Sequence, residues 1–279
     1  MSDINLIGGS GFLGKNFSKL LETNNIDYIS TNSSEYNLLK EEHLSKFKNL
    51  IIKSNSTFIF FSALTPDRGR GIDTFNLNIR MAQNFINLFN EKTADNNHII
   101  YISSDAVYPL SNKNIDDNTY PSPTDLYSSM HLTREIMFKE KFKNLTILRP
   151  TLIYGFGDTH NSYGPNRFFN QMMENKEINI FGEGLDVRDH LYIDDLCKLL
   201  LIFTKNKIYG TYNLATGNSI SYKDLSNLFA NNFSELNKIN KIPTSNNPTK
   251  RYFKIEFLIK ELNYTFSDIN DNLKTYYNY

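Results

Sequence analysis

The feature that most constrains this chain is a glycine-rich turn between an apolar run and a helical pattern. The run Ile4–Ile7 leads directly into the segment Gly8-Gly9-Ser10-Gly11-Phe12-Leu13-Gly14. Glycines at such a place let the backbone turn tightly and approach a pyrophosphate, whose charge is met by free N–H groups and by the positive end of the helix dipole. The turn therefore predicts a dinucleotide-binding β-α-β unit. Its candidate cofactor-binding residues are Gly8, Gly11, Phe12, Leu13 and Gly14.

Short apolar runs and amphipathic stretches alternate through the first half of the chain. Such alternation predicts an α/β fold, a Rossmann-type doubly wound parallel sheet covered by helices. Pro150 breaks regular structure where the chain could leave the sheet. We expect strands at 3–7, 26–30, 56–61, 98–103, 145–148 and 211–214, and helices at 12–24, 73–91, 125–143, 193–205, 221–233 and 255–262.

The break at Pro150 suggests two lobes. We expect residues 1–150 to form the dinucleotide-binding domain, together with a returning segment near 185–215. Residues 151–279 are expected to form a smaller, mainly substrate-binding C-terminal lobe.

Composition excludes several classes of protein. Lysine plus arginine balance aspartate plus glutamate at 30 each, which disfavours nucleic acid and anionic membranes as partners. No basic leader precedes the first apolar run and no apolar stretch could span a bilayer, so we expect a cytoplasmic protein. The single cysteine, Cys197, excludes an internal disulfide and is interpreted as core filling. His160 and His190 lack a third ligand at useful spacing, so no metal is expected.

The choice between NAD and NADP stays open. An acidic residue about 20 positions after the glycine turn would bind the ribose 2′-hydroxyl of NAD. The second predicted strand instead ends in Ser30-Thr31-Asn32-Ser33, which removes a repulsion against the 2′-phosphate of NADP without supplying an arginine for it. We expect Thr31, Ala63 and Asn78 to lie beside the cofactor.

A second group of polar residues follows the predicted strand 98–103. Ser104 and Asp105 stand where this strand leaves its apolar pattern, at the edge of the sheet where such folds bind ligands. About twenty residues later Tyr127 and His131 lie one turn apart on one face of a predicted helix. A tyrosine there could exchange a proton with a sugar hydroxyl. Two roles for Asp105 stay open: an acid in the reaction, or a loop carboxylate that faces water.

Taken in order, these motifs resemble the extended short-chain dehydrogenase/reductase family, in its branch of sugar-nucleotide epimerases, dehydratases and reductases. They cover most of the chain, and the ordered series is more specific than any one motif. They are the glycine turn, Asn78 and Asn84, Ser103-Ser104-Asp105-Ala106-Val107-Tyr108, Tyr127, Leu148-Arg149-Pro150-Thr151-Leu152-Ile153-Tyr154-Gly155, Phe181-Gly182-Glu183-Gly184 and Arg188-Asp189-His190-Leu191-Tyr192-Ile193-Asp194-Asp195.

The resemblance implies how such a site works. Ser104 would hydrogen-bond the reacting sugar oxygen, Tyr127 would be the acid or base, and hydride would pass between nicotinamide and a sugar carbon, commonly C4. Arg188 would help to hold the nucleotide, and Asn166 and Arg167 would reach phosphate or sugar. Arg251, in Thr249-Lys250-Arg251-Tyr252, is a weaker candidate for the task of Arg188, and we interpret that segment as a solvated basic turn. The resemblance further implies a homodimer through the helices at 73–91 and 125–143, and a role in bacterial polysaccharide synthesis.

Two departures from the family pattern shape the expected chemistry. The family places a lysine four residues after the tyrosine, to bind the nicotinamide ribose and lower the tyrosine pKa, where this chain has His131. Dehydratases of the branch have Asp-Glu where this chain has Asp105-Ala106, which favours epimerisation or simple oxidation and reduction. A 4-ketoreductase without epimerisation, or a dinucleotide-binding protein with little catalysis, are the alternatives.

Overall fold

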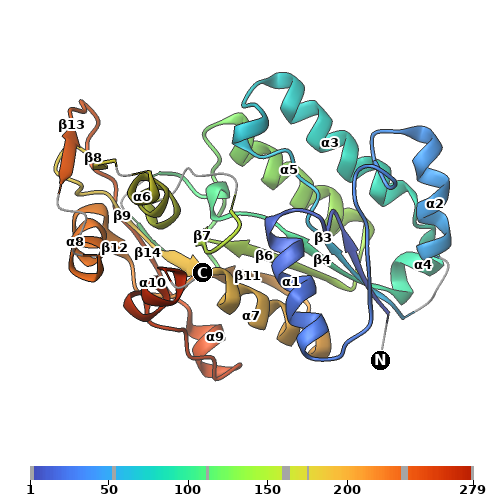
Figure 1. Cartoon of the computed structure of the whole chain (residues 1–279). Helices are drawn as coiled ribbons and strands as arrows, with labels where there is room; N and C mark the ends of the chain where they lie inside the picture. The colour runs from blue at the N-terminus through green and yellow to red at the C-terminus, as the bar shows by residue number, and fades with distance from the viewer. Residues whose placement is uncertain are drawn as a thin grey trace. The chain divides into compact units, whose positions relative to one another are not determined.

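The computed structural model describes residues 3–51, 55–110, 113–158, 164–174, 176–233 and 238–277 (Figure 1). The chain divides into two compact units, which are described separately. The first unit comprises Met1–Pro109, Tyr120–Arg149 and Cys197–Tyr212, and the second comprises Leu110–Thr119, Pro150–Leu196 and Asn213–Tyr279.

A six-stranded sheet organises the first unit, in the order β11-β6-β4-β3-β1-β2. The pairings from β2 through β6 are parallel, with Ile4 opposite Tyr28 on one side and Thr57 on the other. Buried parallel strands need apolar side chains on both faces, which explains the unbroken apolar runs of β3 and β4. The predicted Rossmann-type sheet is confirmed. Its strands are β1 (Ile4–Ile7), β2 (Tyr28–Ser30), β3 (Thr57–Phe60), β4 (His98–Ile102), β6 (Leu145–Pro150) and β11 (Gly210–Leu214).

Helices cover this sheet, and α3 and α5 lie side by side (Figure 1). Their inward faces meet the sheet in an aromatic cluster, in which the Phe60 ring lies 5.0 Å from Phe85 and 5.3 Å from Phe138. The Phe138 ring also stacks on Tyr101 of β4 at 4.9 Å, so α5, which carries Tyr127, packs against β4 as well. The helices of this part of the fold are α1 (Phe12–Thr23), α2 (Glu41–Ile51), α3 (Ile72–Asn87), α4 (Glu91–Asn96), α5 (Leu126–Lys141) and α7 (Ile193–Asn206).

The helix expected at 73–91 ends early in the structure. It ends at Asn87, and a new helix, α4, begins at Glu91. Asn90 starts the second helix because its side-chain oxygen accepts a hydrogen bond from the backbone N–H of Thr93 at 2.8 Å. The predicted helix therefore runs four residues too far, up to the start of a second helix that the sequence interpretation missed.

The second unit is built from short elements around its own core. Phe168, Leu225 and Phe229 are fully buried at its centre. Its strands pair two by two, β10 with β7, β12 with β9, β13 with β8 and β14 with β5. The strands are β5 (Lys113–Ile115), β7 (Leu152–Tyr154), β8 (Ile178–Phe181), β9 (Val187–Arg188), β10 (His190–Tyr192), β12 (Ile220–Ser221), β13 (Ile239–Ile242) and β14 (Arg251–Phe253), and the helices are α6 (Gly164–Met173), α8 (Tyr222–Asn232), α9 (Glu256–Lys260) and α10 (Ile269–Tyr277).

Two details of the sequence interpretation can be checked here. The cysteine is buried in α7, as predicted. The stretch around Arg251, interpreted as a solvated basic turn, is instead strand β14, and the Arg251 side chain is buried. Among the described residues, no helix is long and apolar enough to cross a bilayer.

Candidate functional site

The glycine turn has the geometry that a bound diphosphate requires. Gly8 has φ +81°, a conformation that L side chains rarely adopt, and its N–H donates to the Thr31 hydroxyl at 3.1 Å. A methyl group on Gly14 would lie 2.4 Å from the Gly9 Cα, so the helix could not pack on the turn. A methyl group on Gly11 would meet only the Gly8 carbonyl, at 3.7 Å. Space beside Gly11 is therefore open to a ligand.

The first turn of α1 offers uncompensated positive charge at the same place. Gly11 is the N-cap residue, no side chain caps the helix, and no acidic residue lies in its first turn. The N–H groups of Phe12, Leu13 and Gly14 therefore have no acceptor within the helix. Together with the helix dipole they favour an anion there. The residues present fit the diphosphate of a dinucleotide.

The end of β2 supports the turn from within. The buried Thr31 hydroxyl donates to the Leu6 carbonyl at 3.1 Å and accepts from Gly8 N–H, so it braces the turn. The next residue, Asn32, uses its side-chain oxygen to accept from the backbone N–H groups of Ser34 and Glu35. Thr31 is thus placed beside the turn, with its hydroxyl engaged inside the protein.

The loop after β3 is tied to α3 by one asparagine. The buried Asn78 side chain accepts from the Leu64 N–H at 2.9 Å and donates to the Leu64 carbonyl at 3.0 Å. This loop contains Ala63, which is half-buried, and Ser62, whose side chain fills the space that a methyl on Gly8 would need. Asn78 therefore acts by fixing the loop that borders the turn.

Ser104 and Tyr127 come together beyond the carboxyl end of β4. Ser104 caps a short 3-10 helix (η2, Asp105–Val107), where its hydroxyl oxygen accepts from the Ala106 N–H at 3.1 Å. Burial, then the negative charge of Asp105, raises the pKa of Tyr127 to about 12, while a hydrogen bond from Ser104 opposes that rise. Asp105 is itself buried, which contradicts its alternative interpretation as a solvated carboxylate.

His131 lies one turn further along α5. Its side chain is buried, and its ring meets that of Tyr127 edge-on with 4.8 Å between centroids. Nδ1 lies 2.9 Å from the Tyr101 hydroxyl, whereas Nε2 is buried without a partner among the described residues. Burial and the charge of Arg134 lower the pKa of His131 to about 3. At neutral pH the imidazole carries no charge.

Sequence reasoning missed two buried charged residues on α5, Arg134 and Glu135. Arg134 donates to backbone carbonyls, whereas Glu135 accepts from Ser103 at 2.7 Å and binds Arg149 at 2.6 Å. Arg134 stands three residues after His131 and seven after Tyr127, so helical periodicity alone places it on their face. A charged residue on an inward helix face was the signal that could have found it.

The predicted substrate residues Asn166 and Arg167 lie on α6 in the second unit. Asn166 is fully buried, accepts from the Gly155 N–H at 3.0 Å and donates to Asp158 at 2.5 Å. Arg167 donates to the Asn179 carbonyl at 2.6 Å, and its Nε is buried with no partner among the described residues. Asn166 thus supports the loop from Gly155 to Asp158. The Nε of Arg167 is a donor that no described residue accepts from.

Arg188 also belongs to the second unit, at the end of β9. Its Nη1 donates to the carbonyls of Val187 and Thr249, at 2.8 and 2.9 Å. Its Nη2 donates to the Thr249 hydroxyl at 2.6 Å and lies 3.4 Å from the Asp186 carboxylate. The guanidinium thus anchors the segment before β14. His160 lies outside the described residues, and elsewhere in the described chain no cluster of three or more metal-binding side chains occurs.

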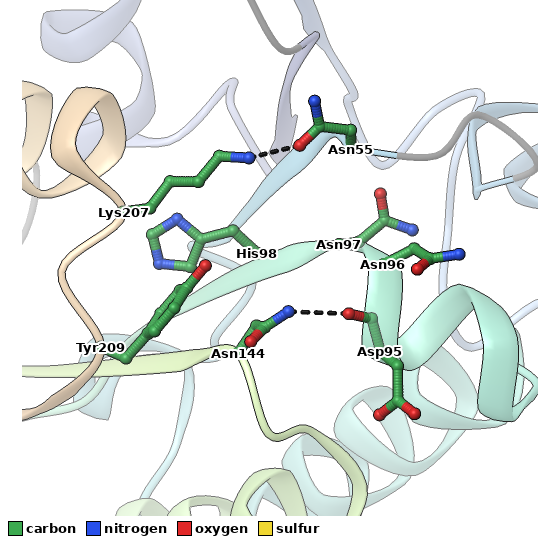
Figure 2. Close-up of a pocket in the computed structure, with 8 residues that line it drawn as sticks. All are labelled: Asn55, Asp95, Asn96, Asn97, His98, Asn144, Lys207 and Tyr209. Carbon is green, nitrogen blue, oxygen red and sulfur yellow. Dashed lines mark hydrogen bonds between the residues drawn. The ribbon is translucent and has the colours of Figure 1, made fainter.

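A polar pocket of about 380 Å³ lies at the opposite, amino-terminal edge of the sheet (Figure 2). Its polar groups largely bind one another: Lys207 donates to Asn55, and Asn144 donates to the Asp95 carbonyl at 2.7 Å. These contacts join the starts of neighbouring strands. The pocket is lined by Asn55, Asp95, Asn96, Asn97, His98, Asn144, Lys207 and Tyr209.

Sequence comparison finds relatives that act on nucleotide sugars. The dTDP-D-glucose 4,6-dehydratase of Dictyostelium discoideum is 25% identical over 269 residues, which cover 81% of this chain and 61% of that protein. The ADP-L-glycero-D-manno-heptose-6-epimerase of Brachyspira hyodysenteriae is 26% identical over 249 residues, which cover 78% of this chain and 77% of that protein. The chain thus spans less than two thirds of the first relative.

Structural comparison finds the same fold. The UDP-glucose 4-epimerase of Thermus thermophilus, in complex with NAD, superposes with a TM-score of 0.84 at 13% identity, over 99% of this chain and 98% of that one. These three proteins are named for three different reactions, so the likeness identifies a family rather than a reaction. The model of the NAD dependent epimerase/dehydratase family matches residues 4–215. The chain belongs to this family of NAD-dependent enzymes.

Proposed function

We propose that this protein transfers hydride between NAD and C4 of a nucleotide-activated sugar, as an epimerase or an oxidoreductase. The observation that carries the proposal is the placement of Ser104, at the start of η2, and Tyr127, at the start of α5, against each other beyond the carboxyl end of β4. The uncapped start of α1 follows β1 of the same sheet. A bound dinucleotide would accept or deliver the hydride. Ser104 would hold the sugar oxygen, and Tyr127 would exchange its proton. The proposed setting is sugar supply for a bacterial polysaccharide.

The proposed cofactor residues and partner surfaces follow from the same arrangement. The diphosphate would lie against the N–H groups of the first turn of α1, and Arg167 and Arg188 would contact the nucleotide sugar. We favour NAD over NADP because no cation stands among Ser30, Thr31 and Asn32 at the end of β2. For the homodimer we propose the outer faces of α3 and α5, which expose apolar side chains: Ile72, Leu77 and Ile136.

One observation favours a second candidate, a protein that binds the dinucleotide with little catalysis. His131 is uncharged at neutral pH, so it lowers the Tyr127 pKa less than a lysine at this position would. A tyrosine with a pKa near 12 is a weak acid at neutral pH, which favours binding with little catalysis.

The test begins with the intact protein. Denaturation should release a dinucleotide, whose identity distinguishes NAD from NADP. Nicotinamide absorbance is then recorded while UDP-, GDP-, CDP- and dTDP-sugars are added one at a time. We expect one sugar to change the absorbance of the wild-type protein but not of the Tyr127→Phe variant. Binding of NAD with no response to any sugar would favour the second candidate.

A further inference from the structure

The first unit contains a buried cation that the resemblance does not predict. The Arg134 side chain has no exposed surface, and its guanidinium carbon lies 5.4 Å from the centroid of the Phe60 ring. Nη1 donates to the Ser62 carbonyl and Nε to the Asn78 carbonyl, both at 2.9 Å. Among the described residues no carboxylate forms an ion pair with it. The guanidinium therefore carries a positive charge whose hydrogen-bond acceptors are uncharged.

The Ser62 carbonyl places this charge at the carboxyl edge of the sheet. Ser62 lies two residues beyond the end of β3, which is paired with β4 so that Phe60 stands opposite Tyr101. Ser62 is therefore level with the end of β4, which leads to Ser104. Ser62 also packs against the glycine turn, since a methyl group on Gly8 would lie 3.1 Å from the Ser62 Cα. The cation thus lies at the same edge as the turn and Ser104.

The same cation lies on the face of α5 that carries Tyr127. His131 follows Tyr127 by four residues and Arg134 follows it by seven, which places all three on one face of the helix. The helix rises about 1.5 Å per residue and long side chains lean toward its start, so the guanidinium lies within roughly 10 Å of Tyr127. In agreement with this, the charge of Arg134 opposes the rise that burial causes in the Tyr127 pKa.

Arg134 is the one cation on this part of α5. Burial lowers the pKa of His131 to about 3, so its imidazole is neutral at pH 7. Glu135 is paired with Arg149 of β6 at 2.6 Å. Asp105, a buried carboxylate at the start of η2, adds a negative charge that Arg134 offsets. Burial lowers the pKa of Arg134 itself, but a guanidinium keeps its proton at neutral pH.

We propose that Arg134 supplies, one turn further along α5, the positive charge that the family's lysine would carry at position 131, and that this charge favours the reduced dinucleotide over the oxidised one. This rests on the proposed function in that a dinucleotide occupies the site with its nicotinamide beside Tyr127. The oxidised ring carries a positive charge and the reduced ring carries none, so Arg134 repels only the oxidised form. At a separation of about 10 Å and an effective dielectric constant of about 20, this repulsion changes the affinity roughly tenfold.

The measurement is the binding of NADH and of NAD⁺ to protein freed of dinucleotide, with no sugar present. Calorimetry gives both dissociation constants, and their ratio isolates the charge, because a poorer fit weakens both forms. Arg134→Gln keeps a donor for the Ser62 carbonyl without the charge and should shift the ratio about tenfold toward NAD⁺. Arg134→Lys keeps the charge and should retain the wild-type ratio, a rescue that a purely structural role does not predict.

Two further variants complete the test. Arg80→Met removes an exposed arginine of α3, whose charge water and salt screen, so as the matched control it should leave the ratio unchanged. Arg134→Met is a second neutral variant and decides if Arg134→Gln does not fold. A neutral variant with the wild-type ratio would overturn the proposal. A lysine variant that shifts the ratio as far as the neutral variants do would also overturn it.

The sugar panel separates this inference from the proposed function. A shifted ratio in the neutral variants, with no response of the wild-type protein to any sugar, would refute only the proposed reaction. A response to one sugar together with an unshifted ratio would refute the role of Arg134 and leave the proposed function standing. If neither NADH nor NAD⁺ binds, both are refuted.

Discussion

The two edges of the central sheet use similar polar residues in opposite ways. At the amino-terminal edge, Lys207 donates to Asn55, Asn144 donates to the Asp95 carbonyl, and Asn97 accepts from the Ser56 N–H, so these side chains tie the strand starts together. At the carboxyl edge, the first N–H groups of α1 and the Nε2 of His131 lack partners among the described residues. Unpaired polar groups in the interior are costly. The amino-terminal edge has them as well, in Nδ1 of His98 and Oγ1 of Thr57. What distinguishes the carboxyl edge is that its unpaired N–H groups gather at the start of one helix, where they favour an anion.

The largest expected effect tests the reactive edge. Tyr127→Phe should lower turnover of the responding nucleotide sugar by about 10²- to 10⁴-fold, because it removes the proton that the reaction exchanges. Tyr209→Phe, in the pocket at the other edge, is the control and should leave turnover unchanged. Steady-state kinetics of the two variants provide the measurement. Equal losses of turnover would contradict the assignment of the reaction to the carboxyl edge.

A second prediction concerns the structural network beneath the reactive edge. Glu135→Gln should destabilise the protein by about 3–5 kcal/mol, because it leaves the buried Arg149 charge without its partner. Glu140→Gln, at an exposed position of α5, should change the free energy of unfolding by less than about 0.5 kcal/mol. Urea unfolding of both variants provides the measurement, and a small effect of Glu135→Gln would show that the pair contributes little.

A third prediction isolates the open space at the glycine turn. Gly11→Ala should fold normally, since φ is −76° and the methyl meets only one carbonyl at 3.7 Å. It should weaken NAD binding about tenfold or more, because the methyl lies where the diphosphate approaches. Gly71→Ala, at the equivalent start of α3, has nothing within 4 Å and should bind NAD normally in calorimetry. Unchanged affinity of Gly11→Ala would place the diphosphate elsewhere.

A fourth prediction concerns His98 at the amino-terminal edge. Burial lowers its pKa to about 4, whereas the unfolded chain protonates it near 6.5. The unfolded state therefore binds more protons between these values, and stability falls as the pH drops from about 6.5 to about 4. In His98→Gln this part of the loss, on the order of 2 kcal/mol, should be absent from unfolding curves recorded across the window. If the free energy of unfolding depends on pH in the same way in the wild-type protein and in His98→Gln, the prediction is wrong.

The sequence was a good guide to the sheet and to the glycine turn. Long apolar runs and glycines at a strand-to-helix junction act locally, so their consequences can be read without tertiary contacts. The short paired strands of the second unit were missed, because two to four residues carry no periodic signal. Arg251 was misjudged for the same reason, since only the pairing of β14 with β5 buries it.

The candidate site was predictable only in part. The motif around Tyr127 indicated which side chains share a helix face. It did not indicate the protonation states that neighbouring residues impose on those side chains. The neutral state of His131 depends first on its burial and then on the charge of Arg134, which is held by Asn78 from α3. Contacts between elements that are far apart in sequence determine such properties, and no local pattern encodes them.

The replacement of an amine by an imidazole on α5 also changes how the site responds to chemical attack. From Tyr127 to Glu135 the helix contains no lysine, so this face offers no primary amine to acylating agents or reactive sugars. Its one cation, Arg134, has no exposed surface for dicarbonyl reagents to reach. An enzyme that handles carbonyl-bearing sugars would thereby be protected on this face from forming imines with its own substrate or product.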